Sequence, residues 1–294
     1  MVLVVGATGL LGSEICRRLR AAGQPVRAMV RATSARDKVE TLLSTGAATA
    51  IADLKDPASL AQACEGASAV ITTASCTLSR QEGDSIETVD RLGQLHLIDA
   101  ARRAGVRQFV YISIPPGTRD ECALYQAKRE VEDAVAGSGM DYTILLADYF
   151  MEVWLSPALG FDYENHRATV YGSGEAPIAW VSYRDVAATA VDSLTTGAAR
   201  NRTLLVGGPE NLAPHAVVRL FEAATGQSFT VDHVPQEALE KQYAEAGDPM
   251  SRSFAALMLG YAKGCPMDMR ETLGLMPRTL TTVGDYAAAV RRPS

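Results

Sequence analysis

The sequence predicts an α/β protein in which a doubly wound parallel sheet is followed by a smaller, mainly helical C-terminal lobe. An unbroken apolar strand at 2–5 opens the chain and leads into three regularly spaced glycines. Short apolar strands then alternate with helical segments as far as about residue 147. Beyond that point the alternation stops, and proline and glycine separate mainly helical segments. Strands that alternate with helices predict a parallel sheet with helices on both faces.

The expected elements follow from apolar runs and from the glycines that end helices. In the first half we expect strands at 2–5, 26–30, 48–52, 69–73, 108–113 and 141–146, with helices at 10–22, 35–45, 57–64, 84–104 and 123–138. In the second half we expect strands at 168–171, 177–181 and 203–206, a helix from Tyr183, and helices at 214–225, 236–246, 250–263 and 282–291. The strand near 203–206 is expected to return to the sheet.

The segment VLVVGATGLLG joins the first strand, a glycine turn and a helix start. Gly6 allows a tight turn, Gly9 lets backbone amides approach a pyrophosphate, and Gly12 lets the helix pack close to the sheet. The helix N-terminus adds amides and a partial positive charge. This arrangement predicts a dinucleotide site, and a turn without a ligand is the alternative. The expected cofactor contacts in the turn are Gly6, Thr8, Gly9, Leu10, Leu11 and Gly12.

The residue that follows the second strand indicates which dinucleotide fits. A carboxylate about 20 residues after the glycine turn binds the ribose hydroxyls of NAD. Arg31 holds that place here, and a guanidinium instead offers charge-assisted hydrogen bonds to a 2′-phosphate. The predicted cofactor is therefore NADP(H), unless Arg31 is an ordinary surface arginine. Ser34 and Lys38 could add donors, although Lys38 could also point outward from the next helix.

The ends of the third and fourth strands complete the expected cofactor site. Asp53 and Leu54 are placed to meet the adenine, although Asp53 could equally be a turn residue or a helix N-cap. Ala74 and Ser75 follow the fourth strand and are expected to contact the cofactor too.

Composition excludes several classes of partner. A net charge of −6 argues against nucleic acid, and the absence of a run of about 18 apolar residues argues against a membrane span. The sequence opens directly on a strand, with no charged n-region or cleavage site, so we expect no secretion by a signal peptide and a cytoplasmic protein. Five cysteines and four histidines lack ligand spacing, so no metal site is expected. The expected partner is a small-molecule substrate, and a homodimer stays open.

Several stretches resemble the atypical short-chain dehydrogenase/reductase superfamily, in particular its NmrA-like and isoflavone-reductase-like branch. The phosphate loop of that branch is similar to GATGLLG, its NADP-selecting strand to VRAMVR, and its fourth helix and fifth strand to LIDAARRAGVRQFVYIS. The helix that carries its lysine resembles AKREVEDAVAGSGMDYTIL. The resemblance implies a Rossmann domain that binds NADP(H) at 1–155 and a substrate lobe at 156–294.

The resemblance also implies candidate catalytic residues. Standard members use Tyr-x-x-x-Lys, but Tyr125 and Lys128 are one residue too close for that motif. Lys128 matches the lysine that isoflavone-reductase-like enzymes place near the nicotinamide and substrate, and so it is expected to bind cofactor and assist protonation. Its alternative is a solvated lysine paired with Glu132. Ser113 matches the hydrogen-bonding serine of the superfamily, unless it is only a strand-end residue.

An aromatic group after the sixth strand is the candidate substrate pocket. Tyr149, Phe150 and Trp154 could form its wall, and core packing explains them almost as well. Leu146 and Ala147 stand where relatives often have Arg-Pro, which leaves the substrate contacts there in doubt. An apolar cover for an aromatic substrate is expected from Met250, Phe254, Met258, Met267 and Met269.

The leading functional hypothesis is an NADP(H)-dependent reductase that transfers hydride to a quinone, enone, ketone or phenylpropanoid-like compound. The main alternative is a redox-sensing regulator of the NmrA-like type, which binds NADP(H) without catalysis. A third hypothesis, an epimerase or dehydratase with tightly held NAD, is weakened by Arg31 and by the short spacing of Tyr125 and Lys128.

Overall fold

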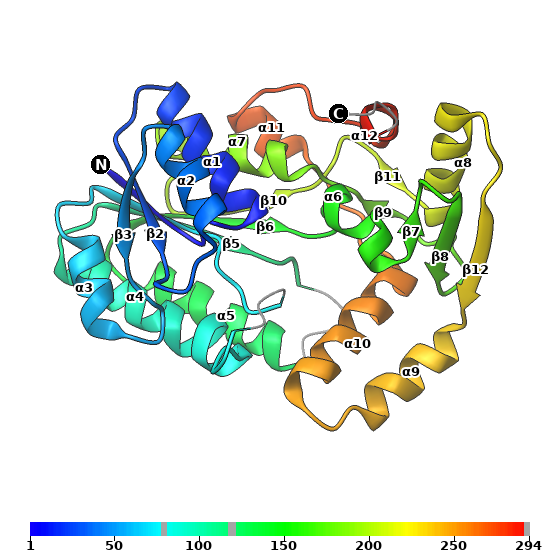
Figure 1. The fold of residues 1–294 in the computed structure, drawn as a ribbon, viewed down its shortest axis with the longest axis horizontal. Coiled ribbons are helices and arrows are strands. Elements are labelled where there is room, and N and C mark those ends of the chain that lie inside the picture. The colour runs from blue at the N-terminus through cyan, green and yellow to red at the C-terminus, as the bar shows by residue number, and fades with distance from the viewer. Residues whose placement is uncertain (78–80, 117–121, 291–294) are drawn as a thin grey trace. The chain divides into compact units, whose positions relative to one another are not determined.

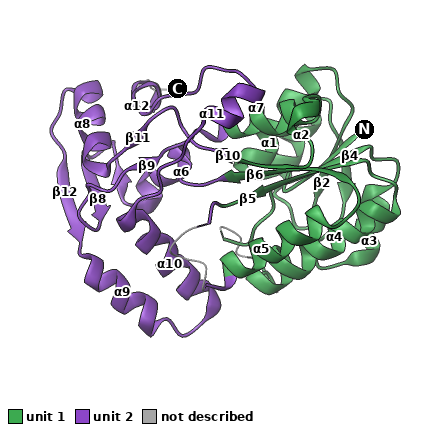
Figure 2. Ribbon diagram, turned by 180° about the vertical axis from the view of Figure 1, so that it is seen from behind, with its two compact units in different colours: residues 1–114, 124–146, 186–204 green, residues 115–123, 147–185, 205–294 purple. Residues whose placement is uncertain are grey.

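The computed structural model describes residues 1–77, 81–116 and 122–290, and these form two compact units (Figures 1 and 2). The first unit contains residues 1–114, 124–146 and 186–204. The second contains the described parts of 115–123, 147–185 and 205–294. The units are discontinuous in sequence because most of helix α7 (Tyr183–Ser193) and the start of strand β10 (Arg202–Val206) belong to the first one.

A seven-stranded parallel sheet forms the centre of the first unit, with the strand order β10-β6-β5-β4-β1-β2-β3. Its other strands are β1 Val2–Val5, β2 Val26–Val30, β3 Ala48–Ile51, β4 Ala69–Thr72, β5 Gln108–Ser113 and β6 Asp141–Ala147. Val2 lies opposite Val26 on one side and Ala69 on the other. The strand order reverses between β1 and β4, which is where doubly wound sheets bind ligands. The Rossmann-like fold predicted from the sequence is confirmed.

Helices cover both faces of this sheet, so β1 is buried along its whole length and needs no polar residue. Figures 1 and 2 show α1, α2 and α7 on one face and α3, α4 and α5 on the other. Their bounds are α1 Leu10–Ala21, α2 Arg36–Ser44, α3 Pro57–Cys64, α4 Leu92–Arg103 and α5 Ala123–Ala136. A short 3-10 turn, η3, covers Gly197–Ala199.

The segment that the sequence predicts as one helix at 84–104 begins with a π-helix, η1, at Ile86–Arg91 and continues as α4. Ser85 caps η1: its hydroxyl accepts from the Thr88 amide, and the Thr88 hydroxyl accepts from the Ser85 amide, both at 3.0 Å. The single-helix prediction is wrong because apolar periodicity does not separate these helix types over one turn. Short π-helical segments are often found at functional sites.

The second unit combines two small sheets with six helices in its described residues. Its strands are β7 Phe161–Asp162, β8 Arg167–Tyr171, β9 Ile178–Ala179, β11 Asn211–Leu212 and β12 Thr230–Val234. Its helices are α6 Met151–Trp154, α8 Pro214–Thr225, α9 Gln236–Glu245, α10 Pro249–Lys263, α11 Arg270–Leu275 and α12 Val283–Val290, with a 3-10 turn, η2, at Pro157–Leu159. Residue 291 of the predicted last helix lies outside the described residues.

The sequence analysis does not anticipate β12, α6, α11 or the short strand β11. Strand β12 pairs in parallel with β8 along its length. None of its residues is fully buried, so the apolar run that marked the central strands is missing. Helices α6 and α11 are too short for a clear apolar period.

Candidate functional site

The glycine turn after β1 has a backbone that side chains at Gly6 and Gly12 would obstruct. Gly6 has φ +81°, and a Cβ there would lie 2.6 Å from the Thr73 hydroxyl oxygen and 2.9 Å from the Ala74 amide nitrogen. A Cβ at Gly12 would lie 2.7 Å from the carbonyl carbon of Gly6. Both glycines are therefore required by the turn itself, and Gly12 allows α1 to start directly against it.

The N-terminus of α1 is suited to an anion. Gly9 caps the helix without a side-chain hydrogen bond, and the first turn contains no acidic residue. The Gly9 amide donates to the Gly6 carbonyl at 3.0 Å and closes the turn. Thr8 is half-buried and Leu10 is exposed, whereas the Leu11 side chain is in the core. The first-turn amides and the partial positive charge can together receive a diphosphate.

Arg31 follows β2 and is held by a carboxylate that the sequence analysis missed. Its Nη1 lies 2.6 Å from Oδ2 of Asp84, and Nζ of Lys55 lies 2.6 Å from Oδ1 of the same residue. The Asp84 side chain is only 2% exposed, whereas those of Arg31 and Lys55 are 30% and 27% exposed. The loops after β2 and β3 thus each supply one cation to a buried carboxylate that precedes η1. These three residues are called the rim cluster below.

The residues expected beside Arg31 have different roles in the structure. The Ser34 hydroxyl accepts from the Arg31 amide at 2.9 Å and so shapes the loop. Lys38 is exposed on α2. Asp53 accepts from the Lys55 amide at 2.9 Å, as a turn residue does, and its contact with the adenine stays a prediction. The Leu54 side chain is buried against α4. A Cβ added at Gly93 would lie 2.7 Å from the Cβ of Leu54.

Ala74 and Ser75 follow β4 and therefore lie beside the glycine turn. The Ala74 carbonyl accepts from the side-chain amide of Gln94 at 3.1 Å, and the Thr72 hydroxyl lies 3.1 Å from the Gln94 carbonyl oxygen. Gln94 is fully buried on α4. One amide side chain therefore connects α4 to the loop after β4.

Lys128 is buried on α5 and pairs with a carboxylate inside the unit. Its Nζ lies 3.6 Å from Oδ1 of Asp90, whose side chain is fully buried on η1. The other Asp90 oxygen accepts from the Cys76 amide at 2.9 Å. The alternative of a solvated Lys128 paired with Glu132 is wrong, since Glu132 pairs with Arg129 at 2.7 Å. Lys128, Asp90 and Tyr111 are called the buried cluster below.

Tyr111 is the third member of the buried cluster. Its ring centroid lies 5.1 Å from Lys128 Nζ. Burial acts to lower the pKa of Lys128, but Tyr111 and Asp90 raise it by more, so the net shift is upward. Burial raises the pKa of the Tyr111 phenol. The ammonium and the neutral phenol are therefore the stable forms at neutral pH.

Tyr125 and Ser113, the other two candidate catalytic residues, are both buried. Tyr125 is fully buried on α5, one turn before Lys128. Ser113 is the last residue of β5, and Arg129 donates to its hydroxyl at 3.4 Å and also to the Ile114 carbonyl. The structure thus gives Ser113 a local partner.

The aromatic residues of the second unit pack against one another. Tyr149 is buried at φ +48°, with its ring centroid 4.9 Å from that of Trp154 and 6.0 Å from that of Trp180. Trp154 also stacks on Tyr261 at 5.7 Å. Phe150 forms an isolated β-bridge with Val181. This packing gives Tyr149 and Trp154 a core role within their unit.

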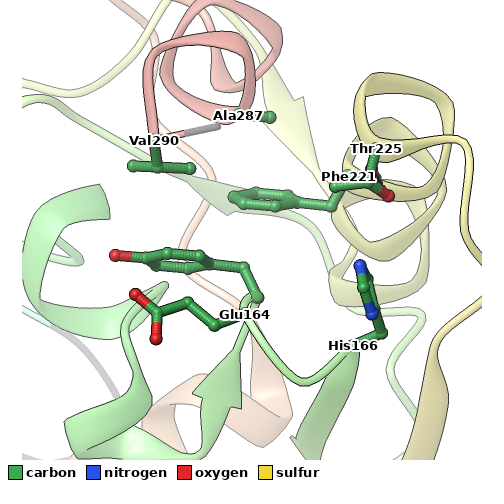
Figure 3. Close-up of a pocket in the computed structure, with 7 residues that line it drawn as sticks. Glu164, His166, Phe221, Thr225, Ala287 and Val290 are labelled. Carbon is green, nitrogen blue, oxygen red and sulfur yellow. Dashed lines mark hydrogen bonds between the residues drawn. The ribbon is translucent and has the colours of Figure 1, made fainter. Parts of the chain in front are cut away.

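A separate pocket of about 350 Å³ lies in the second unit (Figure 3). It is lined by Tyr163, Glu164, His166, Phe221, Thr225, Ala287 and Val290. None of the predicted site residues lines it. Across the described ranges, no three or more His, Cys, Asp or Glu side chains are grouped to hold a metal ion, and no helix has the length and apolar character needed to cross a membrane.

Comparisons with known proteins find a matching family model and relatives that cover most of this chain. The model of the NmrA-like family matches residues 1–287. An NAD(P)H azoreductase from Xenophilus azovorans is 29% identical over 296 residues, covering 98% of this chain and 97% of the relative. A photosystem II assembly factor from Synechocystis sp. is 29% identical over 296 residues, covering 97% of this chain and 89% of the relative.

The fold has a similar solved counterpart. The crystal structure of an NADPH-dependent quinone oxidoreductase from Escherichia coli, complexed with NADPH, has a TM-score of 0.78 and 21% identity. The likeness covers 99% of this chain and 100% of that one. It supports the architecture along the whole chain.

Proposed function

The chain belongs to the NmrA-like family and has NAD(P)H-dependent reductases among its homologues, and from this premise we propose that it uses NADPH to reduce a small aromatic or conjugated compound. One observation carries the proposal. The glycine turn follows β1, Arg31 follows β2, and Lys128 on α5 lies beside Tyr111 of β5, so all three belong to elements at or after the carboxyl ends of strands of one parallel sheet. This is the edge at which such sheets bind dinucleotides.

The residues at this edge fit NADPH in charge and shape. The uncapped first turn of α1 suits the diphosphate. Arg31 and Lys55 supply positive charge where a 2′-phosphate is expected, and both are partly exposed. The loop with Asp53 and Leu54 would border the adenine. Ala74 and Ser75 would border the part of the cofactor that lies beyond the diphosphate, away from the adenine.

Lys128 would act on the substrate as a fixed cation. Bound NADPH supplies the hydride. Because its pKa is raised, Lys128 keeps its proton at neutral pH and can donate a hydrogen bond to an oxygen or nitrogen that gains negative charge. Asp90 holds the ammonium in place from inside the unit. In this proposal Lys128 stabilises charge and orients the acceptor, and water supplies the proton that completes the reduction after hydride transfer.

The substrate class is proposed from chemistry and from a relative. Hydride transfer needs an electrophilic acceptor held in a water-poor site, and quinones, azo compounds and enones offer one. The azoreductase relative is named for the reduction of azo compounds with NAD(P)H. We therefore place azo dyes, quinones and enones first in the search for a substrate.

The test is turnover of NADPH with a panel of these compounds. Lys128→Met should lower kcat by about 100-fold, the scale seen when a preorganised hydrogen-bond donor is removed, with a much smaller change in the Kd of NADPH. The control is Lys241→Met, which removes a lysine that is 70% exposed on α9 and should leave kcat unchanged. Absence of turnover with every compound would contradict the proposed activity. Unchanged kcat in Lys128→Met would contradict the role of Lys128.

A binding regulator without catalysis is the second candidate. Tyr125 is fully buried on α5 and stands one residue too close to Lys128 for the usual motif of the superfamily, and one relative is named as an assembly factor. Such a regulator should bind NADP⁺ and NADPH with different affinities and should transfer no deuterium from C4-labelled NADPH. Stereospecific loss of deuterium to any acceptor would exclude it.

A further inference from the structure

Asp84 joins both cations of the rim cluster and anchors the segment before η1. Its two oxygens each lie 2.6 Å from a cation, one from Arg31 and one from Lys55. Lys55 also donates to the Glu82 carbonyl at 3.0 Å. The segment 81–84 is therefore fastened to the loops that follow β2 and β3.

The burial of the three side chains sets their roles. Asp84 is 2% exposed, so its carboxylate lies under the surface, while the side chains of Arg31 and Lys55 are 30% and 27% exposed. An arginine has five N–H donors and a lysine three. Arg31 therefore keeps donors for a second anion. Lys55 keeps one, since it also donates to the Glu82 carbonyl, and its Nζ lies 3.9 Å from Oδ2 of Asp53. Lys55 is a phosphate-binding candidate that the sequence analysis missed.

We propose that Asp84 is a specificity-determining residue that limits the preference for NADPH over NADH, by neutralising part of the charge of Arg31 and Lys55. This inference rests on the proposed function, because it takes NADP(H) to bind at this edge. A 2′-phosphate carries nearly two negative charges, so the neighbouring carboxylate repels it. The 2′-hydroxyl of NADH carries no charge, so the charge of that carboxylate changes the affinity for NADH much less.

The test is Asp84→Asn, which keeps the size of the side chain and removes its charge. Calorimetry would give Kd values for NADPH, NADH, adenosine 2′,5′-bisphosphate and 5′-AMP. We expect the two ligands with a 2′-phosphate to bind about three- to tenfold more tightly, with NADH and AMP nearly unchanged. The control is Glu87→Gln, which removes one charge from an η1 carboxylate that is 57% exposed and pairs with Arg91. It should leave the ratio of affinities unchanged.

Lys55→Met tests the same proposal independently, in case Asp84→Asn does not fold. It should weaken NADPH and the bisphosphate by about three- to tenfold and leave NADH unchanged. The proposal is overturned if folded Asp84→Asn shows an unchanged ratio of NADPH to NADH affinity, or binds NADPH more weakly. In that case, binding of NADPH by the wild type still supports the cofactor site. If the wild-type protein binds none of the four ligands, the proposed function fails, and this inference fails with it.

Discussion

The rim cluster and the buried cluster both contain a lysine paired with an aspartate, but the two lysines differ in their exposure to solvent. Each places a lysine against a buried aspartate beside one sheet, with Lys55 and Asp84 at the rim and Lys128 and Asp90 inside. The Lys55 side chain is 27% exposed, whereas that of Lys128 is 7% exposed. A partly hydrated cation can exchange its partner for a ligand phosphate. A buried cation that loses its partner has no water to replace it.

This difference assigns separate tasks to the two clusters. Substitutions that change a charge in the rim cluster should alter the preference between NADPH and NADH, with little effect on stability. Substitutions that change a charge in the buried cluster should alter both stability and activity. The predictions below test that separation, beginning with the largest expected effect.

Removal of Asp90 should cost far more stability than removal of Asp84. Asp90→Ala leaves the Lys128 ammonium and the Cys76 amide without their buried carboxylate, and we expect a loss of about 3–5 kcal/mol in the free energy of unfolding. Asp84→Ala should cost about 1 kcal/mol, since its cations can regain water. Urea denaturation measures both. Asp99→Ala, an exposed carboxylate on α4, is the control and should change stability by less than about 0.5 kcal/mol.

Equal losses for Asp90→Ala and Asp84→Ala would break the comparison. If Asp90→Ala does not fold, Asp90→Asn tests the same order of stability losses with smaller values. The side-chain oxygen of the asparagine can still accept the hydrogen bond from the Cys76 backbone amide. The loss for Asp90→Asn should still exceed that for Asp84→Asn.

Salt concentration should affect the two clusters differently: it should change cofactor affinity at the rim cluster but leave the contribution of the buried cluster to stability unchanged. Between about 0.05 and 0.5 M NaCl, NADPH binding should weaken by about threefold more than NADH binding, because exposed charges are screened. The difference in unfolding free energy between the wild type and Asp90→Asn should stay constant over the same range, since buried charges are screened much less. Titration calorimetry and urea denaturation give the two quantities. Equal salt dependence of NADPH and NADH binding would show that the rim cations do not meet a 2′-phosphate.

The smallest effect is expected at alkaline pH. The folded-state pKa of Lys128 is raised above its ordinary value of 10.5, so its contribution to stability is complete below that pH and is lost as pH rises through the folded-state pKa. The raised pKa of Tyr111 acts in the same direction above 10.0. Unfolding free energy should therefore fall above about pH 10, more steeply in the wild type than in Lys128→Met. Parallel pH profiles would contradict this linkage.

The fold and the glycine turn were predictable because their signals are local. Val2 to Val5 are apolar without interruption, and Gly6 and Gly12 stand where a side chain would collide with the turn. Each signal spans a few neighbouring residues, so periodicity and glycine spacing capture it. The position of Arg31 after β2 follows from the same local order.

The carboxylates were missed because they meet their partners across long separations. Asp84 lies 53 residues from Arg31 in sequence, and no local pattern joins them. Asp90 does have a local sequence signal. Together with Gln94, it continues the buried stripe that Leu97 and Ala101 form on the next turns. Two polar residues in an apolar stripe indicate buried partners. The π-helix then changes the register, so the partner could not be named from helical spacing.

The closed form of the glycine turn bears on how fast a cofactor is captured. Its shape is held by the Gly6 backbone, by the hydrogen bond from the Gly9 amide and by the contact at Gly12, all of which exist within the chain alone. A ligand that docks on such a turn does not have to order it first, which removes one source of slow association. We therefore expect nucleotide binding to show no slow ordering phase, both in the wild type and in variants of the rim cluster.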